Sequence, residues 1–532
     1  MESMKQGTQK TPGLVTVRRA LLSAYNKQGL VPFARRLEAL GIEIMASGGT
    51  ARELTDAGIK VRSLDSLTGF SQLFGGRVKT LTPQVHGGIL QRRGHAGDRG
   101  EAEEYGILPI DLVAVDLYPY DSVATDRSKD TADRVELIDI GGPTMLRASA
   151  KNHVSVVSIC DRSDYDRVAG CLESGGGVPL ELSRELACKT FAKTAAYDAL
   201  IASTLGGIEP GTGIERFVWA GEKTRGVRYG ENPGQDGGLY TAPGSLWEGL
   251  QVHQGKELSF NNLLDLVRGA LIMREFASET KAVTTVIKHG IPAGTAKNET
   301  LEEALKRAWD GDALSAFGGV IFFNRQATAG CATFLKDLFF EIVVAPSWSG
   351  AALAIMSKKK RRIVLTWDLL KGSWDIPLKD TRWALDGFLI QDPLPPGPPF
   401  SSWKNVTDAL SVDPRIQSDL EFAWTVCRHI RSNAIVLVKD GMTVGVGAGQ
   451  TSRIDALEIA IHKAGRAGHD LQGSVLASDA FFPFSDVPER AAEVGVVAMA
   501  QPGGSVKDEE SIALCREKGL QMFFTSQRIF TH

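Results

Sequence analysis

Residues 15–64 read VTVRRALLSAYNKQGLVPFARRLEALGIEIMASGGTARELTDAGIKVRSL, and this stretch decides the class of the fold. Its apolar runs VTVRRALLSAY, IEIMAS and IKVRSL alternate with the amphipathic runs LVPFARRLEALG and ARELTDAG. Apolar runs of about four to eight residues between helical runs of about ten are typical of consecutive strand–helix units. Such units build a parallel sheet, so we expect an α/β domain.

The same alternation continues through residues 111–120 and 153–161 and ends in a long helical run at 179–205. Glycines then cluster in GGIEPGTGI at 206–214, which favours a break between domains. The 532 residues also exceed the roughly 250–300 at which one hydrophobic core stops growing. We therefore predict a polar tail at 1–13, a first domain at 14–206 and a second domain at 207–532.

The second domain is expected to be α/β as well, because strand-like runs such as TTVIK, GVIFF, EIVVA, NAIVLV, TVGVG and SVLAS lie between helical runs. Its length of more than 300 residues predicts two subdomains. The proline-rich segment Gln391–Phe400 is predicted to be a surface connection. The run KKKRR at Lys358–Arg362 is interpreted as a solvated helix end, with a nucleic-acid or nuclear-import patch as the alternative.

Composition excludes several classes of protein. Lys and Arg number 60 and Asp and Glu 63, for a formal charge of −3, so no basic field for nucleic acid is expected. The six cysteines form no CxxC pair and no HExxH motif occurs, which predicts a reducing, cytoplasmic location and no zinc site. The polar start and the lack of about 18 consecutive apolar residues predict neither secretion nor membrane spanning.

Residues 44–50, IMASGGT, end a strand and open a helix. Gly48 and Gly49 let the backbone approach an anion, while hydroxyl groups and the N–H groups of the helix start can bind phosphate oxygens. Ser23 and Lys27 would lie beside this turn, because ligands gather at the carboxyl ends of parallel strands. The pattern predicts an anion site, and a turn without a ligand is an equally weighted alternative.

Lys288-His289-Gly290 follows a strand of the second domain, and a turn there lets both side chains reach one pocket. Histidine is the natural general base near neutral pH, and a neighbouring lysine can donate a proton or stabilise negative charge. A structural histidine is the alternative and, on pattern alone, the commoner one. Residues 445–453, GVGAGQTSR, resemble a dinucleotide fingerprint only superficially, so we exclude a nicotinamide site.

Three further loops carry charged or aromatic groups: GRVKT at 76–80, LYPY at 117–120 and DIGG at 139–142. Arg147 and Lys151 follow the last of these on a predicted helix. Considered separately, each loop is more simply explained as an exposed segment whose charges are solvated.

Taken in order, these segments resemble one family. The segments are SGGTA, GGRVKTL, LYPY, IDIGGPTMLRA, RYGENP, the KHG turn, SAFGG, SNAI, SDAFFPF and the closing RIFTH. The chain is similar, from about Leu21 to His532, to the bifunctional purine-biosynthesis enzymes that combine phosphoribosylaminoimidazolecarboxamide formyltransferase with IMP cyclohydrolase. The resemblance implies a methylglyoxal-synthase-like parallel-sheet domain followed by two cytidine-deaminase-like subdomains.

The same resemblance implies the last two steps of IMP synthesis. A formyl group passes from 10-formyltetrahydrofolate, as cosubstrate, to 5-aminoimidazole-4-carboxamide ribonucleotide (AICAR), and the formylated product (FAICAR) closes to IMP with loss of water. The expected partners are therefore small-molecule substrates, with no nucleic acid, no membrane and no required metal. A cytoplasmic homodimer is expected, with formyltransferase sites formed between subunits.

The resemblance also assigns residues. For formyl transfer it implies His289 as base, Lys288 at the departing folate nitrogen or the oxyanion, and Asn433 as an orienting group. The nucleotide would be held by Arg228, Tyr229, Asn262, Phe317, Gly318 and Arg453, and the folate by Pro483, Phe484 and Asp486. For ring closure it implies the catalytic residues Lys79, Tyr118, Asp139 and Lys151, with a phosphate pocket of Ser23, Lys27, Ser47, Gly48, Gly49, Thr50 and Arg77.

The chain departs from the family's pattern at a few positions. In the first domain these are Tyr25, Asn26, Thr82 and Asp116, and in the second Gly234, Ile291 and Arg431. We expect these changes to affect substrate affinity and rate, more for cyclisation than for formyl transfer. A chain that retains only formyl transfer is one alternative to the bifunctional enzyme, and a non-catalytic nucleotide-binding protein is another.

Overall fold

The computed structural model describes residues 13–69, 73–74, 77–124, 126, 128–205, 217–369, 379–407 and 411–532. The chain divides into two compact units, Met1–Glu222 with Ala242–Gly244 and Lys223–Thr241 with Ser245–His532. Most of the predicted tail at 1–13 and the predicted domain boundary at 206 lie outside the described residues.

The smaller unit is built on a parallel sheet, in which the described residues form five strands in the order β4-β3-β2-β5-β6. Every neighbouring pair in it runs parallel, which confirms the α/β class predicted from residues 15–64. The strands are β2 (Arg19–Ala24), β3 (Glu43–Ala46), β4 (Val61–Ser63), β5 (Leu112–Asp116) and β6 (Val157–Ile159), and a separate antiparallel pair joins β1 (Leu14–Val15) to β7 (Val178–Pro179).

Helices cover both faces of this sheet. They are α1 (Leu30–Ala39), α2 (Gly48–Asp56), α3 (Leu64–Thr68), α4 (Pro83–Leu90), α5 (Ala96–Glu104), α6 (Tyr120–Ala124), α7 (Thr131–Glu136), α8 (Gly141–Lys151), α9 (Tyr165–Gly175) and α10 (Leu180–Leu205). Along β2, Ala20 and Leu22 pack in one core with α1 and α9, whereas Leu21 packs in a second core with α4 and α8. This alternation buries the strand on both faces, as parallel sheets require.

The larger unit is built on one mixed sheet. Its strands within the described ranges follow the order β10-β15-β14-β13-β11-β12-β20-β19-β21-β22-β23-β18. Their bounds are β10 (Gln251–Gln254), β11 (Ala282–Lys288), β12 (Ile291–Asn298), β13 (Val320–Phe323), β14 (Ile342–Ala345), β15 (Ile363–Thr366), β18 (Lys404–Asn405), β19 (Ile435–Lys439), β20 (Met442–Gly447), β21 (Val475–Ser478), β22 (Ala498–Gln501) and β23 (Gln521–Phe524).

The same topology occurs twice in this sheet. In the first half, β11 pairs antiparallel with β12 and β13, and β13, β14 and β15 follow in parallel. In the second half, β19 pairs antiparallel with β20 and β21, and β21, β22 and β23 follow in parallel. The halves meet where β12 lies beside β20. The larger unit therefore contains two repeated subdomains, while their likeness to cytidine deaminase stays a prediction.

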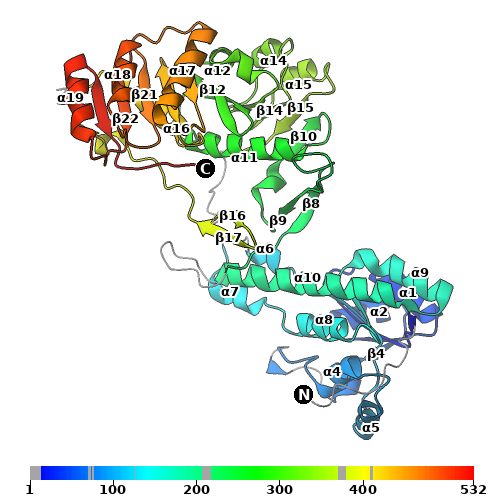
Figure 1. The fold of residues 1–532 in the computed structure, drawn as a ribbon. Coiled ribbons are helices and arrows are strands. Elements are labelled where there is room, and N and C mark those ends of the chain that lie inside the picture. The colour runs from blue at the N-terminus through cyan, green and yellow to red at the C-terminus, as the bar shows by residue number, and fades with distance from the viewer. Residues whose placement is uncertain are drawn as a thin grey trace. The chain divides into compact units, whose positions relative to one another are not determined.

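The two faces of the large sheet are covered differently (Figure 1). On one face, α11 (Phe260–Glu275) and α16 (Pro414–Cys427) pack into a core shared by both halves. On the other face each half has its own core. The helices there are α12 (Leu301–Asp310), α14 (Ala329–Leu335) and α15 (Gly350–Met356) in the first half, and α17 (Arg453–Ala467), α18 (Asp486–Glu493) and α19 (Asp508–Lys518) in the second.

Smaller elements complete this unit. They are the short helix α13 (Ala313–Ala316), the antiparallel pair β8 (Glu222–Gly226) and β9 (Gly238–Thr241), and the hairpin of β16 (Asp380–Ala384) and β17 (Gly387–Gln391). Among the helices that the structure describes, none has both the length and the apolar character needed to cross a membrane.

Truncating the centre of the small sheet should weaken it strongly. Leu21 is fully buried in β2 between Met45 and Val113, so Leu21→Ala should lower the free energy of opening of this sheet by about 2–5 kcal/mol. Amide hydrogen exchange of β2 and β5 measures it. Leu40→Ala, at a position 41% exposed, is the control and should change this free energy by under about 1 kcal/mol; equal effects would contradict the described core.

Candidate functional sites in the two units

The carboxyl edge of the five-stranded sheet brings three loops together. β3, β2 and β5 are neighbours and run parallel, with Leu22 beside Ala46 and Ala24 beside Asp116. The loops after these strands therefore begin next to one another, where ligands of parallel sheets bind. These loops carry the predicted residues Lys27, Ser47, Gly48, Gly49, Thr50 and Tyr118, and Ser23 lies near the end of β2.

The turn after β3 is shaped to admit a lysine. Gly48 has a φ of +54°, a left-handed conformation that favours glycine. A Cβ at this position would lie only 2.5 Å from Nζ of Lys79, so the lysine amine rests directly against the turn. Thr50 is buried, and its hydroxyl accepts a hydrogen bond from the N–H of Ala24 at 3.0 Å. The predicted anion-binding turn is thus joined to the end of β2 and to Lys79.

Lys27 lies in the same place. Its ammonium donates to the carbonyl of Ala24 and, at 3.5 Å, to the hydroxyl of Thr50. Burial lowers the pKa of Lys27, and the positive charge of Lys79 lowers it further, while Glu53 and Asp116 oppose this shift. Two lysine side chains next to a glycine turn and a helix start are suited to bind an anion.

Asp139 lies just before α8 and is tied to the backbone around it. Its carboxylate accepts the N–H of Gly142 at 2.8 Å, and its own N–H donates to the hydroxyl of Tyr197 at 2.8 Å. Burial raises the pKa of Asp139, although backbone N–H groups of Gly142, Tyr118 and Gly141 counter the shift. A carboxyl group with a raised pKa can exchange protons closer to neutral pH than a free one.

The anion turn and Asp139 are connected through the residues beside them. A Cβ at Gly141 would lie 2.8 Å from the hydroxyl oxygen of Thr80, so the segments that carry Asp139 and Lys79 are in contact. Tyr118 is 52% exposed and its ring meets that of Tyr25 edge-on, with centroids 5.3 Å apart. The structure therefore brings Lys27, Lys79, Tyr118 and Asp139 to one edge of the sheet.

Lys151 lies at the other end of α8 from Asp139. It is the last residue of α8, whose first turn follows Asp139, so about 15 Å of helix separates the two residues. The next residue, Asn152, donates to the carbonyl of Ile89 at 2.7 Å, beside the start of β5. Lys151 is thus at the amino edge of the sheet, opposite the other predicted residues. Arg77 pairs with Glu136 of α7 on the surface.

Strand register defines a corresponding edge in the larger sheet. Ile287, near the end of β11, pairs with Val320 at the start of β13. Ile435, at the start of β19, pairs with Gly447 at the end of β20 and with Ser478 at the end of β21. These strand ends face the same way as the β11–β12 turn, because β12 and β20 are antiparallel neighbours.

Five of the predicted motifs consequently lie at this edge, although they are far apart in sequence. They are KHG at 288–290, SAFGG at 315–319, SNA at 432–434, GAGQTSR at 447–453 and SDAFFPF at 478–484. The sequence predicted these residues in separate motifs. The repeated topology of the sheet brings the motifs to one edge.

The KHG turn is a two-residue connection in a left-handed conformation. Lys288 pairs with Ile291, and the two residues between them, His289 and Gly290, have φ values of +51° and +72°. Such turns match the twist of a hairpin but are unfavourable for a residue with a Cβ. Lys288 donates from Nζ to the carbonyl of Gly318 at 2.9 Å. The lysine is therefore held while the imidazole of His289 stands on the turn itself.

The predicted nucleotide residues have different surroundings. Phe317 is 58% exposed and its ring lies against Phe339, with centroids 4.7 Å apart. Asn262 is buried and forms a capping box with Ser259 at the start of α11, and its Nδ2 donates to Glu341 at 2.8 Å. Asn262 therefore has a clear structural role as well as the predicted binding role.

Arg228 and Tyr229 lie in the loop between β8 and β9. The guanidinium of Arg228 lies 4.8 Å from the ring centroid of Tyr229 and donates to its hydroxyl at 3.1 Å. A cation placed on an aromatic face is a preorganised contact for an anionic or planar ligand.

Asn433 and Arg453 are organised by the second subdomain. Asn433 donates from Nδ2 to the carbonyl of Gln450 at 2.9 Å. Arg453 pairs at 3.2 Å with Asp479, whose side chain is fully buried. The end of the chain also reaches this place, because the N–H of Ile529 donates to the carbonyl of Asp479 and the ring of Phe530 lies 6.0 Å from the guanidinium of Arg453.

The predicted folate residues follow β21. Phe484 is 61% exposed, and Asp486 is the first residue of α18, where its carboxylate accepts the N–H of Val487 at 2.8 Å. Pro483 precedes them in the same loop. They follow the end of β21, on the same edge of the sheet as the KHG turn.

Comparison with known proteins agrees with this geometry. A family model described as AICARFT/IMPCHase bienzyme matches residues 149–463, which is more than half of the chain. The chain belongs to this family. A model described as MGS-like domain matches residues 29–144, within the smaller unit, in accord with the predicted methylglyoxal-synthase-like fold.

Relatives of the bienzyme match over nearly the full length. The bifunctional purine biosynthesis protein PurH of Bacillus subtilis (strain 168) is 42% identical over 524 residues, which cover 97% of this chain and 100% of that protein. PurH of Nostoc sp. (strain PCC 7120 / SAG 25.82 / UTEX 2576) is 43% identical over 521 residues, with the same two coverages. A structure titled Crystal structure of ForH is 42% identical and covers 36% of this chain and 96% of its own, with a TM-score of 0.33.

Two departures from the bienzyme pattern have structural roles here. Thr82 caps α4 by accepting the N–H of Val85 at 3.4 Å. Asp116 accepts the N–H of Asn26 at 2.8 Å, and its charge partly opposes the lowering of the Lys27 pKa by burial. Both side chains therefore accept hydrogen bonds from the local backbone and stabilise it.

Sequence reasoning missed several polar residues at these sites. Asp265 of α11 accepts the N–H of Gly290 at 2.6 Å, and Asp479 holds Arg453. Tyr197 of α10 binds the backbone at Asp139, and burial raises its pKa to about 12. Asp265 and Tyr197 lie within long helices and belong to none of the predicted motifs, whereas Asp479 lies inside the predicted SDAFFPF motif, which gives no signal that it pairs with Arg453.

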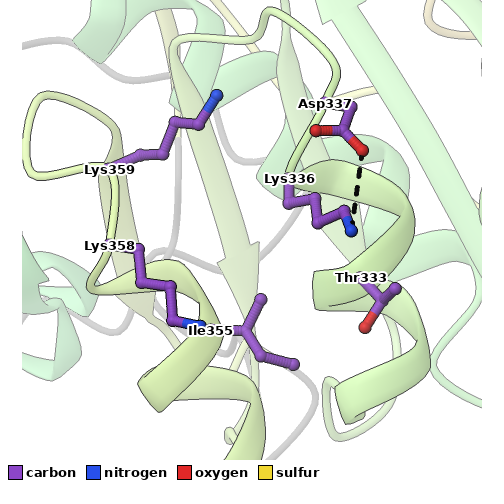
Figure 2. A pocket seen from close by; sticks show the side chains of 6 residues that line it. All are labelled: Thr333, Lys336, Asp337, Ile355, Lys358 and Lys359. Carbon is purple, nitrogen blue, oxygen red and sulfur yellow. Dashed lines mark ion pairs between the residues drawn. The ribbon is translucent and has the colours of Figure 1, made fainter.

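A hollow on the larger unit is separate from these sites. It lies beside α14 and α15 and is lined by Thr333, Lys336, Asp337, Ile355, Lys358 and Lys359 (Figure 2). Lys336 pairs with Asp337 at 3.8 Å. Arg362, the last residue of the KKKRR segment, donates hydrogen bonds to the backbone carbonyls of Leu335 and Leu338. This arginine therefore stabilises the end of α14.

Within the part of the chain that the structure describes, no three His, Cys, Asp or Glu side chains gather as a metal site would require. The six cysteines are free.

The lowered pKa of Lys27 should appear in anion binding. Because the ammonium loses its proton at a lower pH than an exposed lysine, affinity for inorganic phosphate should fall as the pH rises through this lowered pKa. Lys27→Arg keeps its charge, so its affinity should stay level over the same range. Titration calorimetry from about pH 7 to 10 tests this. Exposed Lys60→Arg is the control, and identical profiles for wild type and Lys27→Arg would contradict the assignment.

Proposed function

We propose that this chain catalyses both reactions of its family, formyl transfer from 10-formyltetrahydrofolate to AICAR and dehydrative closure of FAICAR to IMP. The observation that carries the proposal is the KHG turn, where Lys288 is held on the carbonyl of Gly318 and His289 stands in a left-handed conformation. Relatives named as bifunctional, which match this chain over nearly its full length, support assigning both steps to one chain.

Formyl transfer needs a proton to leave a weak nucleophile. The amine of AICAR attacks the formyl carbon, a C–N bond forms, the bond from that carbon to the folate nitrogen breaks, and one proton moves from the amine to the departing nitrogen. In the proposed mechanism His289 takes the proton, and Lys288 returns one to the leaving nitrogen or stabilises the oxyanion. Asn433, held on the carbonyl of Gln450, orients the base or the formyl group.

Binding groups surround these residues in the proposal. Arg228, Tyr229, Phe317, Gly318 and Arg453 hold the nucleotide, with Asn262 shaping the start of α11 behind them. Pro483, Phe484 and Asp486 hold the folate, where the exposed ring of Phe484 offers a face for stacking.

Ring closure is assigned to the smaller unit. The carboxamide nitrogen attacks the formyl carbon, and the formyl oxygen leaves as water with one proton from each of the two nitrogens. Asp139, Lys79 and Tyr118 are proposed to move these protons, since they meet at one edge of the sheet. The phosphate lies on Ser23, Lys27, Ser47, Gly48, Gly49 and Thr50, with Arg77 beyond them. Lys151, at the last position of α8, stays a predicted catalytic residue for this step.

We further propose a cytoplasmic homodimer. Six free cysteines suit a reducing compartment. In the β16–β17 hairpin, Trp383 is 83% exposed, Leu385 fully exposed and Leu389 66% exposed. Among described strands, β16 and β17 pair only with each other. A two-stranded hairpin is marginally stable in water, and exposed apolar clusters mark protein interfaces, which supports a second copy as the partner.

Single substitutions should separate the two activities. His289→Ala should lower kcat for tetrahydrofolate release by about 10²- to 10⁴-fold while leaving closure of supplied FAICAR intact. Asp139→Asn should do the reverse. Chromatography that resolves tetrahydrofolate, FAICAR and IMP measures both.

His462→Ala, on an exposed face of α17, is the control for these variants and should leave both rates unchanged. Loss of both activities in His289→Ala would contradict two separate sites. Wild-type protein that accumulates FAICAR would support a formyltransferase alone, and wild-type protein without turnover would support a nucleotide-binding protein.

The hairpin should determine the oligomeric state. Trp383→Glu or Leu389→Glu places a charge in the proposed interface, so we expect a shift from dimer toward monomer by light scattering, with loss of formyl transfer on dilution. Val506→Glu, at another fully exposed apolar position, is the control and should remain dimeric. A wild-type monomer with full activity would refute the dimer.

A further inference from the structure

The larger unit contains the same two-residue turn twice. Lys288-His289-Gly290 joins β11 to β12, and Lys439-Asp440-Gly441 joins β19 to β20. The paired strands begin at the same register, because Lys288 pairs with Ile291 and Lys439 with Met442. The φ values also match, at +51° and +72° in the first turn and +52° and +71° in the second. The two turns are therefore equivalent parts of the repeated subdomains.

Each turn is held by an aspartate from the preceding helix. Asp265 lies six residues after Ser259, the N-cap of α11, and Asp419 lies six residues after Asp413, the N-cap of α16. Asp265 accepts the N–H of Gly290 at 2.6 Å. Asp419 accepts the N–H groups of Gly441 and Asp440, both at 2.7 Å. Both carboxyl groups are largely buried beneath their turns, and this burial raises the pKa of each.

The two turns differ in the partners of their side chains. In the second turn, Lys439 pairs with Asp470 and Asp440 pairs with Arg415, each at 3.1 Å. In the first turn, Lys288 is held by a carbonyl. Within the described residues, the side chain of His289 forms no hydrogen bond or ion pair. The second turn is thus closed by ion pairs, whereas in the first turn the imidazole of His289 is held by its backbone and by the charge of the nearby Asp265 carboxylate.

We propose that Asp265 is a positioning residue for formyl transfer, which holds the left-handed turn through the Gly290 N–H and thereby aims the imidazole of His289. The inference rests on the proposed function, in which His289 takes the proton of the amine. Because the ring has no hydrogen bond or ion pair of its own among the described residues, its direction depends on the backbone of residues 289 and 290 and on the charge of Asp265 beside it. That backbone is unfavourable for a residue with a Cβ and needs an external hydrogen bond to persist.

Asp419 gives a matched control for the test. Asp265→Ala and Asp419→Ala remove the same contact from equivalent hairpins of one sheet, but only the first hairpin carries the proposed base. Hydrogen exchange of the amides of Gly290 and Gly441 in the full chain should each quicken by about tenfold or more in the respective variant. This readout reports the hydrogen bond without any turnover.

The rates should then diverge. We expect Asp265→Ala to lower kcat for tetrahydrofolate release by about 10- to 100-fold, with KM for AICAR changed by less than about threefold. Asp265→Asn keeps an acceptor oxygen and should recover most of the rate. Asp419→Ala should leave kcat within about twofold of wild type, and closure of FAICAR should be unchanged in all three variants.

The outcomes separate this inference from the function on which it rests. Wild-type protein that releases no tetrahydrofolate would contradict the proposed function itself. With an active wild type, unchanged kcat in Asp265→Ala, or an equal loss in Asp419→Ala, would overturn the positioning role. If Asp265→Ala does not fold, Asp265→Asn decides, because kcat must follow the exchange of the Gly290 amide. Near-wild-type exchange with a near-wild-type kcat, or faster exchange with a lowered kcat, supports the role; faster exchange with a wild-type kcat, or a lowered kcat with wild-type exchange, refutes it.

Discussion

The two-residue turn between β11 and β12 is the constraint on which the larger unit's site depends. Its left-handed residues, His289 and Gly290, fix Lys288 opposite Ile291. A slip of one residue would turn every side chain of the hairpin to the other face of the sheet, removing Lys288 from the carbonyl of Gly318. The pairing of β12 with β20 then places the loops of the second subdomain at the same edge of the sheet as this turn.

In both units the sheet brings the predicted site residues to one edge, but the two sheets differ in strand direction. In the smaller unit, parallel strands bring the ends of β2, β3 and β5 together, and the glycine turn there accommodates Lys79. In the larger unit, an antiparallel hairpin presents its turn, and the repeated topology adds the strand ends of the second half. Each arrangement places cations and a proton acceptor on backbone that the sheet holds rigid, which is where proton transfer and anion binding are best organised.

Much of this could be predicted from sequence, for identifiable reasons. Alternating apolar and amphipathic runs predicted the α/β class, and two glycines after a strand predicted the turn at Gly48. Asp265 was out of reach because it lies within α11 and meets Gly290 only in the folded chain. The motif that includes Lys151 suggested a shared site with Asp139, but a helix of this length separates its two ends.

A crystal structure of the full chain with AICAR bound would test the account most directly. The account predicts a ribonucleotide at the edge of the large sheet, with its exocyclic amine within about 3.2 Å of the His289 imidazole and its phosphate on arginine side chains of that edge. AICAR bound with its amine far from His289, or with the KHG turn in another backbone conformation, would contradict the claim that this turn builds the formyltransferase site.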